Sequence, residues 1–199
     1  DKGWGWYLDG KREKKTNTFD DFAASGRALI EAKYTSAKRI VGHGGSAGGM
    51  LMGAVANRSG ELFAGIVAEV PFVDVLNTML DDTLPLTPPE WPEWGNPIES
   101  EKDFRTILSY SPYDNVAARD YPAILAMGGL TDPRVTYWEP AKWIARLRAT
   151  MTGGGPVLLR TNMGAGHGGA SGRFNRLDEI AIVYAFALWA VGLADKAEA

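Results

Sequence analysis

The sequence contains no cysteine and only two histidines in 199 residues. Without cysteine the chain can form neither a disulfide framework nor a reactive thiolate. Two histidines without an H-E-x-x-H pattern predict no metal centre, and no glycine-rich loop ends in Lys-Ser or Lys-Thr as phosphate-binding loops do. The sequence therefore predicts neither a metal ion nor a cofactor, and any chemistry must come from ordinary side chains.

An excess of charge of one sign is also missing. The chain has 21 basic and 24 acidic residues, which are interspersed apart from a short basic cluster at Lys11–Lys15. This balance predicts no nucleic-acid partner and no anionic membrane surface as partner. No apolar run is long enough to span a bilayer, and we expect no signal peptide in this sequence. We expect a cytoplasmic protein, with the periplasm as the alternative.

Alternating strand and helix patterns are what the sequence does contain. We expect strands over 39–45, 62–72, 123–129 and 156–162, and helices over 18–34, 46–58, 138–150 and 173–194. Acidic residues are expected in the first turn of helix 18–34. Such alternation predicts an α/β fold, a mostly parallel sheet with helices on both faces, in one domain over 1–199. Residues 81–97, rich in proline and tryptophan, follow neither period and are expected to form an ordered loop over the sheet.

Glycines surround one serine at the junction of strand 39–45 and helix 46–58. The residues "GGSAG" at 44–48 fit G-x-S-x-G, the pattern of a nucleophile elbow, in which crowding demands small neighbours. In such a turn the Ser46 hydroxyl points away from the sheet, and the Ala47 amide faces a developing oxyanion. The alternative is a glycine-rich turn that only lets the helix pack closely on its strand.

A nucleophilic serine needs a base, and histidine is the usual one near neutral pH. His167 lies in a glycine-rich loop after strand 156–162, where its ring could reach Ser46. His43 lies within strand 39–45 and is expected to be a packed, satisfied side chain. The alternative for His167 is a solvent-exposed loop residue.

The third member should be an acid between the serine and the histidine. Asp132 directly follows strand 123–129, at the strand end where such sheets bind ligands, and is our choice. Five other aspartates in this interval are the alternatives, and any of them could be a surface charge or a cap: Asp74, Asp81, Asp82, Asp114 and Asp120. His167 would take the proton of Ser46 as it attacks a carbonyl, and Asp132 would fix the imidazole tautomer.

Longer motifs add a family resemblance. "GGSAGG", "VPFVDVLNTMLDDTLPLTPPEWPEWGNP", "SYSPYDNV", "DPRVTYWEPAKW" and "TNMGAGHGG" closely resemble the catalytic domain of the prolyl oligopeptidase family of serine peptidases. The resemblance extends from about Gly5 to the last helix. It implies an α/β-hydrolase fold, normally capped by a β-propeller that admits only short peptides. The branch of the family resembled here cleaves after Lys or Arg, so short peptides with a basic P1 residue are the implied substrates.

The resemblance also implies roles for individual residues. Matched by motif, Ser46, Asp132 and His167 form the triad, and Ala47 supplies one oxyanion amide. The resemblance further assigns a P1-binding carboxylate, an aromatic pocket wall and a clamp on the substrate backbone, which are Glu90, Phe72 and Arg134. We expect Glu90 to be a buried acid at the base of a pocket, where it would bind a cationic side chain through a charge-assisted hydrogen bond. A solvated loop acid is the alternative, and without the resemblance Glu93 is an equal candidate.

Parts of the family pattern are missing. The propeller and the first sheet strands are absent, together with a tyrosine that donates the second oxyanion hydrogen bond. We therefore expect a C-terminal part of a longer enzyme, with an unpaired sheet edge and little activity unless the missing part binds. The alternatives are a related peptidase or esterase with the same triad, or a non-catalytic remnant that binds a partner.

Overall fold

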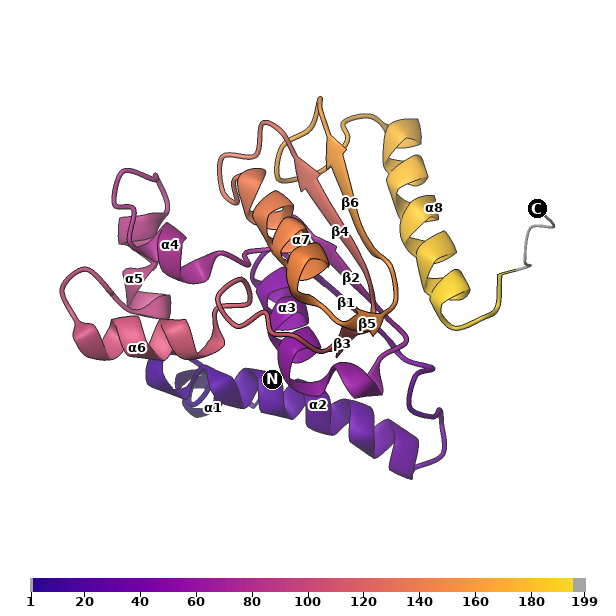
Figure 1. The fold of residues 1–199 in the computed structure, drawn as a ribbon. Helices are drawn as coiled ribbons and strands as arrows, with labels where there is room; N and C mark the ends of the chain where they lie inside the picture. The colour runs from indigo at the N-terminus through magenta and orange to yellow at the C-terminus, as the bar shows by residue number, and fades with distance from the viewer. Residues whose placement is uncertain (1, 195–199) are drawn as a thin grey trace.

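A parallel sheet runs through the centre of the computed structural model, which describes residues 2–194 (Figure 1). In the described residues its strand order is β1-β2-β4-β6. The strands are β1 Val41–Gly45, β2 Gly65–Glu69, β4 Ala123–Gly129 and β6 Val157–Asn162. All three pairings are parallel, so the carboxyl ends of all four strands lie at one edge of the sheet. This confirms the predicted fold class.

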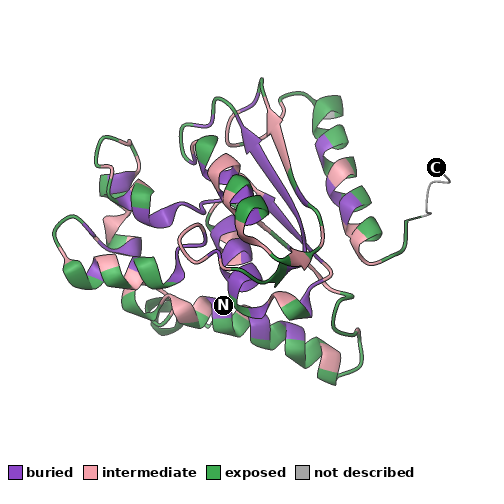
Figure 2. Ribbon diagram, viewed as in Figure 1, coloured by how far each residue is buried: buried purple, intermediate pink, exposed green. Residues whose placement is uncertain are grey.

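Helices cover both faces of the sheet (Figure 1). Helices α3 Ala47–Ser59 and α7 Trp138–Thr150 pack on one face, where α2 Thr16–Glu31 packs on α3. Helix α8 Arg173–Ala190 packs on the other face, over β2 and β4. Strand residues point alternately to the two sides, so Ile66 and Ala68 join the α3–α7 core while Val67 joins the α8 core. Strand β4 is buried throughout its length (Figure 2).

Short helices beside the sheet form the remaining elements. They are α1 Trp4–Leu8, η1 Arg12–Lys14, η2 Gly60–Leu62, α4 Val75–Met79, α5 Thr87–Trp94 and α6 Glu101–Tyr110. Strands β3 Asp120–Tyr121 and β5 Gly153–Gly154 form a separate parallel pair. None of these elements was predicted. Most are too short to show a hydrophobic period, whereas α6, whose ten residues are amphipathic, was missed. Within 2–194 no helix combines the length and the apolar character needed to cross a membrane.

The proline-rich segment 81–97 is not the predicted loop over the sheet. It contains helix α5, which packs against α4 and η1. Pro88 and Pro89 occupy the first turn of α5, where a missing N–H costs nothing because those amides have no partner within the helix. The prolines suggested a loop, although proline is well tolerated in the first turn of a helix.

Other boundaries differ less. Strand β4 and helix α7 coincide with the predicted ranges, whereas β2 is shorter than predicted and α8 ends at Ala190. Helix α2 begins at Thr16, so its first turn holds no acidic residue and Asp20 and Asp21 lie one turn later. The predicted dipole contribution of these two acids is therefore wrong.

His43 is exposed, contrary to the prediction of a packed side chain. Half of its side chain is accessible, and Nε2 lies 2.5 Å from Oε1 of Glu69 on the adjacent strand. The reason is topological, since α8 covers β2 and β4 and β1 is the edge strand of the described sheet. The histidine is therefore paired, as expected, but at the surface.

Candidate active site

Ser46 lies in a strained turn between β1 and α3. Its φ of 57° and ψ of −120° fall outside the regions that residues other than glycine usually adopt. The turn is held on both sides, because the Ser46 amide donates to the Glu69 carbonyl (2.9 Å) and the Ser46 carbonyl accepts from the amides of Met50 and Phe72 (both 3.1 Å). Strain that the surroundings enforce in this way is typical of functional turns.

One glycine of the elbow is required by close approach. A Cβ on Gly44 would lie 2.4 Å from the carbonyl oxygen of Gly48 in the first turn of α3. A Cβ on Gly48, in contrast, would meet no neighbouring atom within 4 Å. The tight turn therefore depends on the glycine two residues before Ser46, and crowding does not explain the glycine two residues after it.

The Ala47 amide opens α3 directly after Ser46. The first amides of a helix have no partner within it and carry the positive end of its dipole. The Ala47 N–H is the first of these amides and directly follows Ser46 in the chain.

Asp132 and His167 form a hydrogen-bonded pair. His167 Nδ1 lies 2.8 Å from Asp132 Oδ2, and the Asp132 side chain is completely buried. Its other oxygen, Oδ1, accepts the amides of Arg134 (2.9 Å) and Val135 (3.0 Å). A carboxylate can only accept, so Nδ1 carries the hydrogen and Nε2 is left as the acceptor of this ring.

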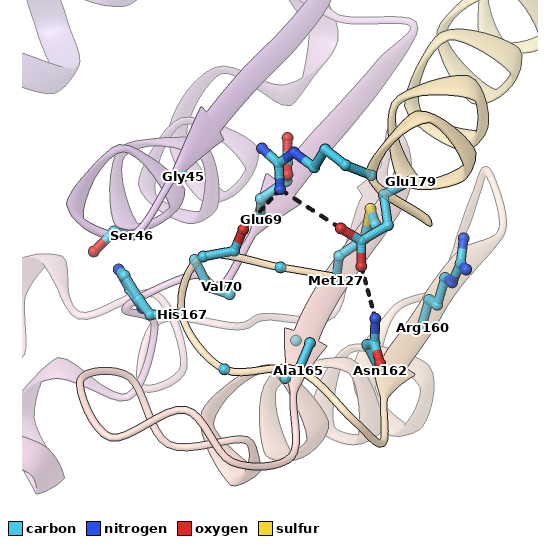
Figure 3. A pocket seen from close by; sticks show the side chains of 16 residues that line it. Gly45, Ser46, Glu69, Val70, Met127, Arg160, Asn162, Ala165, His167 and Glu179 are labelled. Carbon is cyan, nitrogen blue, oxygen red and sulfur yellow. Dashed lines mark hydrogen bonds and ion pairs between the residues drawn. The ribbon is translucent and has the colours of Figure 1, made fainter. Parts of the chain in front are cut away.

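His167 and Ser46 face each other across one end of a pocket of about 300 Å³, which we call the His167 pocket. Figure 3 shows the Ser46 oxygen and a ring nitrogen of His167 pointing toward one another. The structure therefore brings together the three predicted triad residues, from the ends of β1, β4 and β6.

The loop that carries His167 is held from two sides. A Cβ on Gly129 would lie 2.4 Å from the Ala165 carbonyl oxygen, so glycine at the end of β4 lets this loop approach Asp132. Across the pocket, Glu179 of α8 accepts hydrogen bonds from Asn162 Nδ2 and the Ala170 amide, both 2.9 Å (Figure 3 shows the Asn162 bond). These contacts attach both ends of the loop to α8.

Glu179 is ionised in this setting. Desolvation opposes ionisation of the buried carboxyl. The bonds from the Ala170 amide and Asn162, with the charges of Arg176 and Arg160, outweigh it and lower the pKa of Glu179. A charged acceptor makes stronger hydrogen bonds than a neutral one, which favours an ordered His167 loop.

Four of the five aspartates set aside in the sequence have other partners. Asp114 accepts a hydrogen bond from Ser111, and Asp74 pairs with Lys142. Asp81 accepts from Thr83, and Asp120 lies near Thr152.

A second pocket, of about 110 Å³, adjoins Ser46 on the side of α4 and α5; we call it the Glu90 pocket. The residues lining it include Ser46, Ala47, Phe72, Glu90 and Arg134. The four residues to which the resemblance gave binding or oxyanion roles therefore surround one cavity next to the nucleophile. Phe72 is 6% exposed and serves as a wall, whereas the Arg134 side chain is exposed.

Glu90 differs from the expected buried acid because it is only half-buried. Its Oε2 accepts a 2.7 Å hydrogen bond from Trp94 Nε1, one turn later on α5. The Trp94 ring also packs against Phe72, with centroids 5.6 Å apart. Trp94, which the sequence did not single out, therefore contacts both the carboxylate and the aromatic wall. Glu93 lies elsewhere, bonded to Tyr7.

Glu139 is the carboxylate of this pocket that is fully buried. Only 1% of the residue is exposed, and burial raises its pKa to about 7 against the opposing effect of its hydrogen bonds to Thr78, Asp74 and Val73. In the sequence Glu139 is one more acid in the first turn of a helix, so only its pairing with distant residues distinguishes it.

Comparisons with known proteins match nearly the whole chain. The sequence model described as "Prolyl oligopeptidase family" matches residues 1–194. Protease 2 of Moraxella lacunata is 56% identical over 96% of this chain, and dipeptidyl aminopeptidase BI of Pseudoxanthomonas mexicana is 53% identical over 98%. The chain spans 28% and 27% of the length of these two relatives.

A solved structure gives the same result in three dimensions. Oligopeptidase B from Trypanosoma brucei, with covalently bound antipain, superposes with a TM-score of 0.90 at 46% identity. The match covers 94% of this chain and 26% of that protein.

Proposed function

The chain belongs to the prolyl oligopeptidase family, and we propose that it is the catalytic part of a serine oligopeptidase that cleaves short peptides after Lys or Arg. The observation that carries this proposal is the meeting of two features at Ser46. On one side lies the hydrogen-bonded His167–Asp132 pair, and on the other a pocket lined by the carboxylate of Glu90. The first suits acyl transfer and the second suits a cationic side chain.

The proposed reaction begins with attack of Ser46 Oγ on the peptide carbonyl carbon. As the Oγ–C bond forms, His167 Nε2 takes the hydroxyl proton, and Asp132 stabilises the imidazolium through Nδ1–H. The Ala47 amide donates to the oxyanion. When the C–N bond breaks, His167 returns the proton to the leaving amine, which leaves an acyl-enzyme. Water, deprotonated by His167, then attacks the acyl carbon. As the C–Oγ bond breaks, His167 returns the proton to Ser46 Oγ, and the peptide leaves with a new carboxyl group. Covalent binding of antipain to the T. brucei relative supports a covalent mechanism.

Glu90 is the proposed determinant of specificity. Replacing it with glutamine should lower kcat/KM for an Arg-containing dipeptide amide by about 10- to 100-fold, because a hydrogen bond to a charged group contributes roughly 1.5–3 kcal/mol. Glu93→Gln is the matched control, since Glu93 lies on the same helix but outside the Glu90 pocket, and it should change the rate by less than about twofold.

The assay compares Arg, Lys and Pro amides and a simple ester on the full-length natural protein. A preference of the wild type for proline, or equal losses in the two variants, would contradict the assignment of Glu90. Both blocked and unblocked Arg dipeptides are included, because the second candidate is release of N-terminal dipeptides. The name of the P. mexicana relative favours that candidate, and strict dependence on a free amino terminus would establish it.

We further propose that other parts of the same enzyme complete this site. In the described residues β1 pairs only with β2, so one edge of the sheet offers backbone groups to a further strand. By the family resemblance, that missing part supplies earlier strands, a second oxyanion donor and a propeller. The partial coverage of the relatives agrees with this arrangement.

The isolated 199-residue chain should therefore hydrolyse an Arg amide about 100-fold or more slowly than the full-length protein, the usual effect of losing one oxyanion donor. Steady-state assays of both proteins at equal active-site concentration test this. Equal rates would mean that these residues suffice for catalysis.

A further inference from the structure

The Glu90 pocket has a second acidic residue in its lining, Glu139 of α7. Glu139 is 1% exposed, whereas Glu90 is half-buried. Burying a carboxylate is costly unless hydrogen bonds compensate, so a glutamate is rarely buried unless it is paired. The hydrogen-bond partners of Glu139 therefore indicate its structural role.

All the hydrogen bonds that the described residues make to this carboxylate come from outside its own helix. Oε2 accepts the amides of Val73 and Asp74, both at 2.9 Å, and Oε1 accepts the Thr78 hydroxyl at 2.7 Å. Val73 and Asp74 form the entry to α4, and Thr78 lies within it. Glu139 thus fastens α4 and the segment before it to α7.

That segment also carries the wall of the pocket. Phe72 precedes Val73, and its amide donates to the Ser46 carbonyl at 3.1 Å. The Val73 carbonyl accepts the Tyr113 amide at 2.9 Å. The position of Phe72 is therefore fixed on one side by the nucleophile turn and on the other by the bonds of Glu139. Thr78 lines the same pocket.

We infer that Glu139 is a positioning residue for the Glu90 pocket, whose ionised carboxylate holds Phe72 and α4 in the arrangement that receives the basic side chain of the substrate. This inference rests on the proposed function. It goes beyond it by giving the pocket a second, buried acid that acts on KM and does not touch the reacting atoms.

The charges around Glu139 make this role dependent on pH. Burial raises the pKa of Glu139 to about 7, and the neighbouring Asp74 also raises it, although Lys142 of α7 pairs with Asp74. Glu90 of α5 and Arg134 of the loop after β4 line the same cavity. A substrate cation entering the pocket favours the ionised form of Glu139.

The direction in which KM changes with pH follows from the hydrogen bonds of Glu139. When the pH falls below about 7, Glu139 takes up a proton and becomes a weaker acceptor for the amides of Val73 and Asp74. KM for a basic substrate should then rise by about tenfold between pH 8 and pH 6, the change expected when binding requires one group of pKa about 7 to be ionised.

The experiment compares two substrates of the full-length protein from pH 5.5 to 8.5. One is an Arg dipeptide amide, which fills the Glu90 pocket, and the other is p-nitrophenyl acetate, whose acetyl group does not reach it. The ratio of their kcat/KM values cancels any pH dependence of the acyl-transfer steps that the two reactions share. In the wild type this ratio should rise about tenfold from pH 6 to pH 8.

Glu139→Gln should flatten that profile. At pH 8 it should raise KM for the Arg amide about tenfold and leave ester hydrolysis within about twofold. The control is Glu179→Gln, which changes another buried carboxylate that accepts a backbone amide, but in the His167 pocket. That variant should leave the profile of the ratio unchanged, whatever it does to either rate alone.

Thr78→Val keeps the carboxylate and removes one donor. Because the Thr78 bond lowers the pKa of Glu139, this variant should move the midpoint of the ratio to higher pH. It keeps the inference testable if Glu139→Gln does not fold, which circular dichroism would reveal.

Several results would overturn the inference. They are a wild-type ratio that does not change with pH, a Glu139→Gln profile like that of the wild type, equal losses with both substrates, or an unmoved midpoint in Thr78→Val. Ester hydrolysis that requires Ser46, without hydrolysis of the Arg amide, would instead refute the proposed specificity, and this role of Glu139 with it.

Discussion

Replacement of Ser46 by alanine is expected to lower kcat for a peptide amide by about a millionfold, the loss seen when a triad serine is removed. Alanine removes Oγ, so no acyl-enzyme can form, while the pockets on either side of the residue remain. KM should change little for the same reason. The measurement is steady-state hydrolysis of an Arg dipeptide amide by the full-length protein.

Ser109→Ala provides the matched control. Ser109 is an exposed serine of α6 whose hydroxyl donates to the Thr106 carbonyl, and its loss should change kcat by less than about twofold. A covalent serine reagent should add its mass to the wild type and to Ser109→Ala, but not to Ser46→Ala. Labelling of Ser46→Ala, or a kcat within tenfold of the wild type, would place the nucleophile elsewhere.

The second large effect is expected from Asp132→Asn, which should lower kcat by about 10⁴-fold. The carboxylate accepts Nδ1–H of His167 at 2.8 Å and two backbone amides through its other oxygen. Asparagine retains the shape, but its amide group can present a donor to Nδ1. The ring would then adopt the other tautomer, with the hydrogen on Nε2, and could no longer accept the proton of Ser46.

Asp114→Asn is the control for this substitution, because Asp114 follows α6 and accepts a hydrogen bond from Ser111 away from both pockets. Its kcat should stay close to that of the wild type. The decisive comparison is kcat at equal folded fraction, checked by thermal unfolding. If Asp132→Asn lost less than about tenfold, another acid would have to orient His167.

The central elements could be predicted from the sequence because their hydrophobic patterns are clear. β4 is buried on both faces and reads as an unbroken apolar run, and α7 shows a clear apolar stripe. The strand–turn–helix setting of Ser46 and the strand before Asp132 then placed the candidate residues at one edge of the sheet. The substrate residues, in contrast, came from the family resemblance alone.

What the sequence could not show depends on contacts between distant segments. Helix α5 is short and begins with prolines, so it carries no readable period. His43 looked buried because strand residues usually are, and only the sheet order shows that β1 lies at an edge. Glu139 accepts hydrogen bonds from Val73 and Thr78, which lie 66 and 61 positions earlier in the sequence. A local sequence pattern cannot show such distant contacts.

The wholly parallel sheet has a consequence for how the site comes into being during folding. Parallel neighbours cannot be joined by a tight turn, so every pairing in this sheet closes a long loop of chain. Asp132 and His167 meet only after β6 has docked on β4, across 35 residues of sequence. Contacts between residues so far apart in the sequence form slowly during folding. Helices therefore arise before there is any site, and the pair that would activate Ser46 exists only in the nearly complete fold.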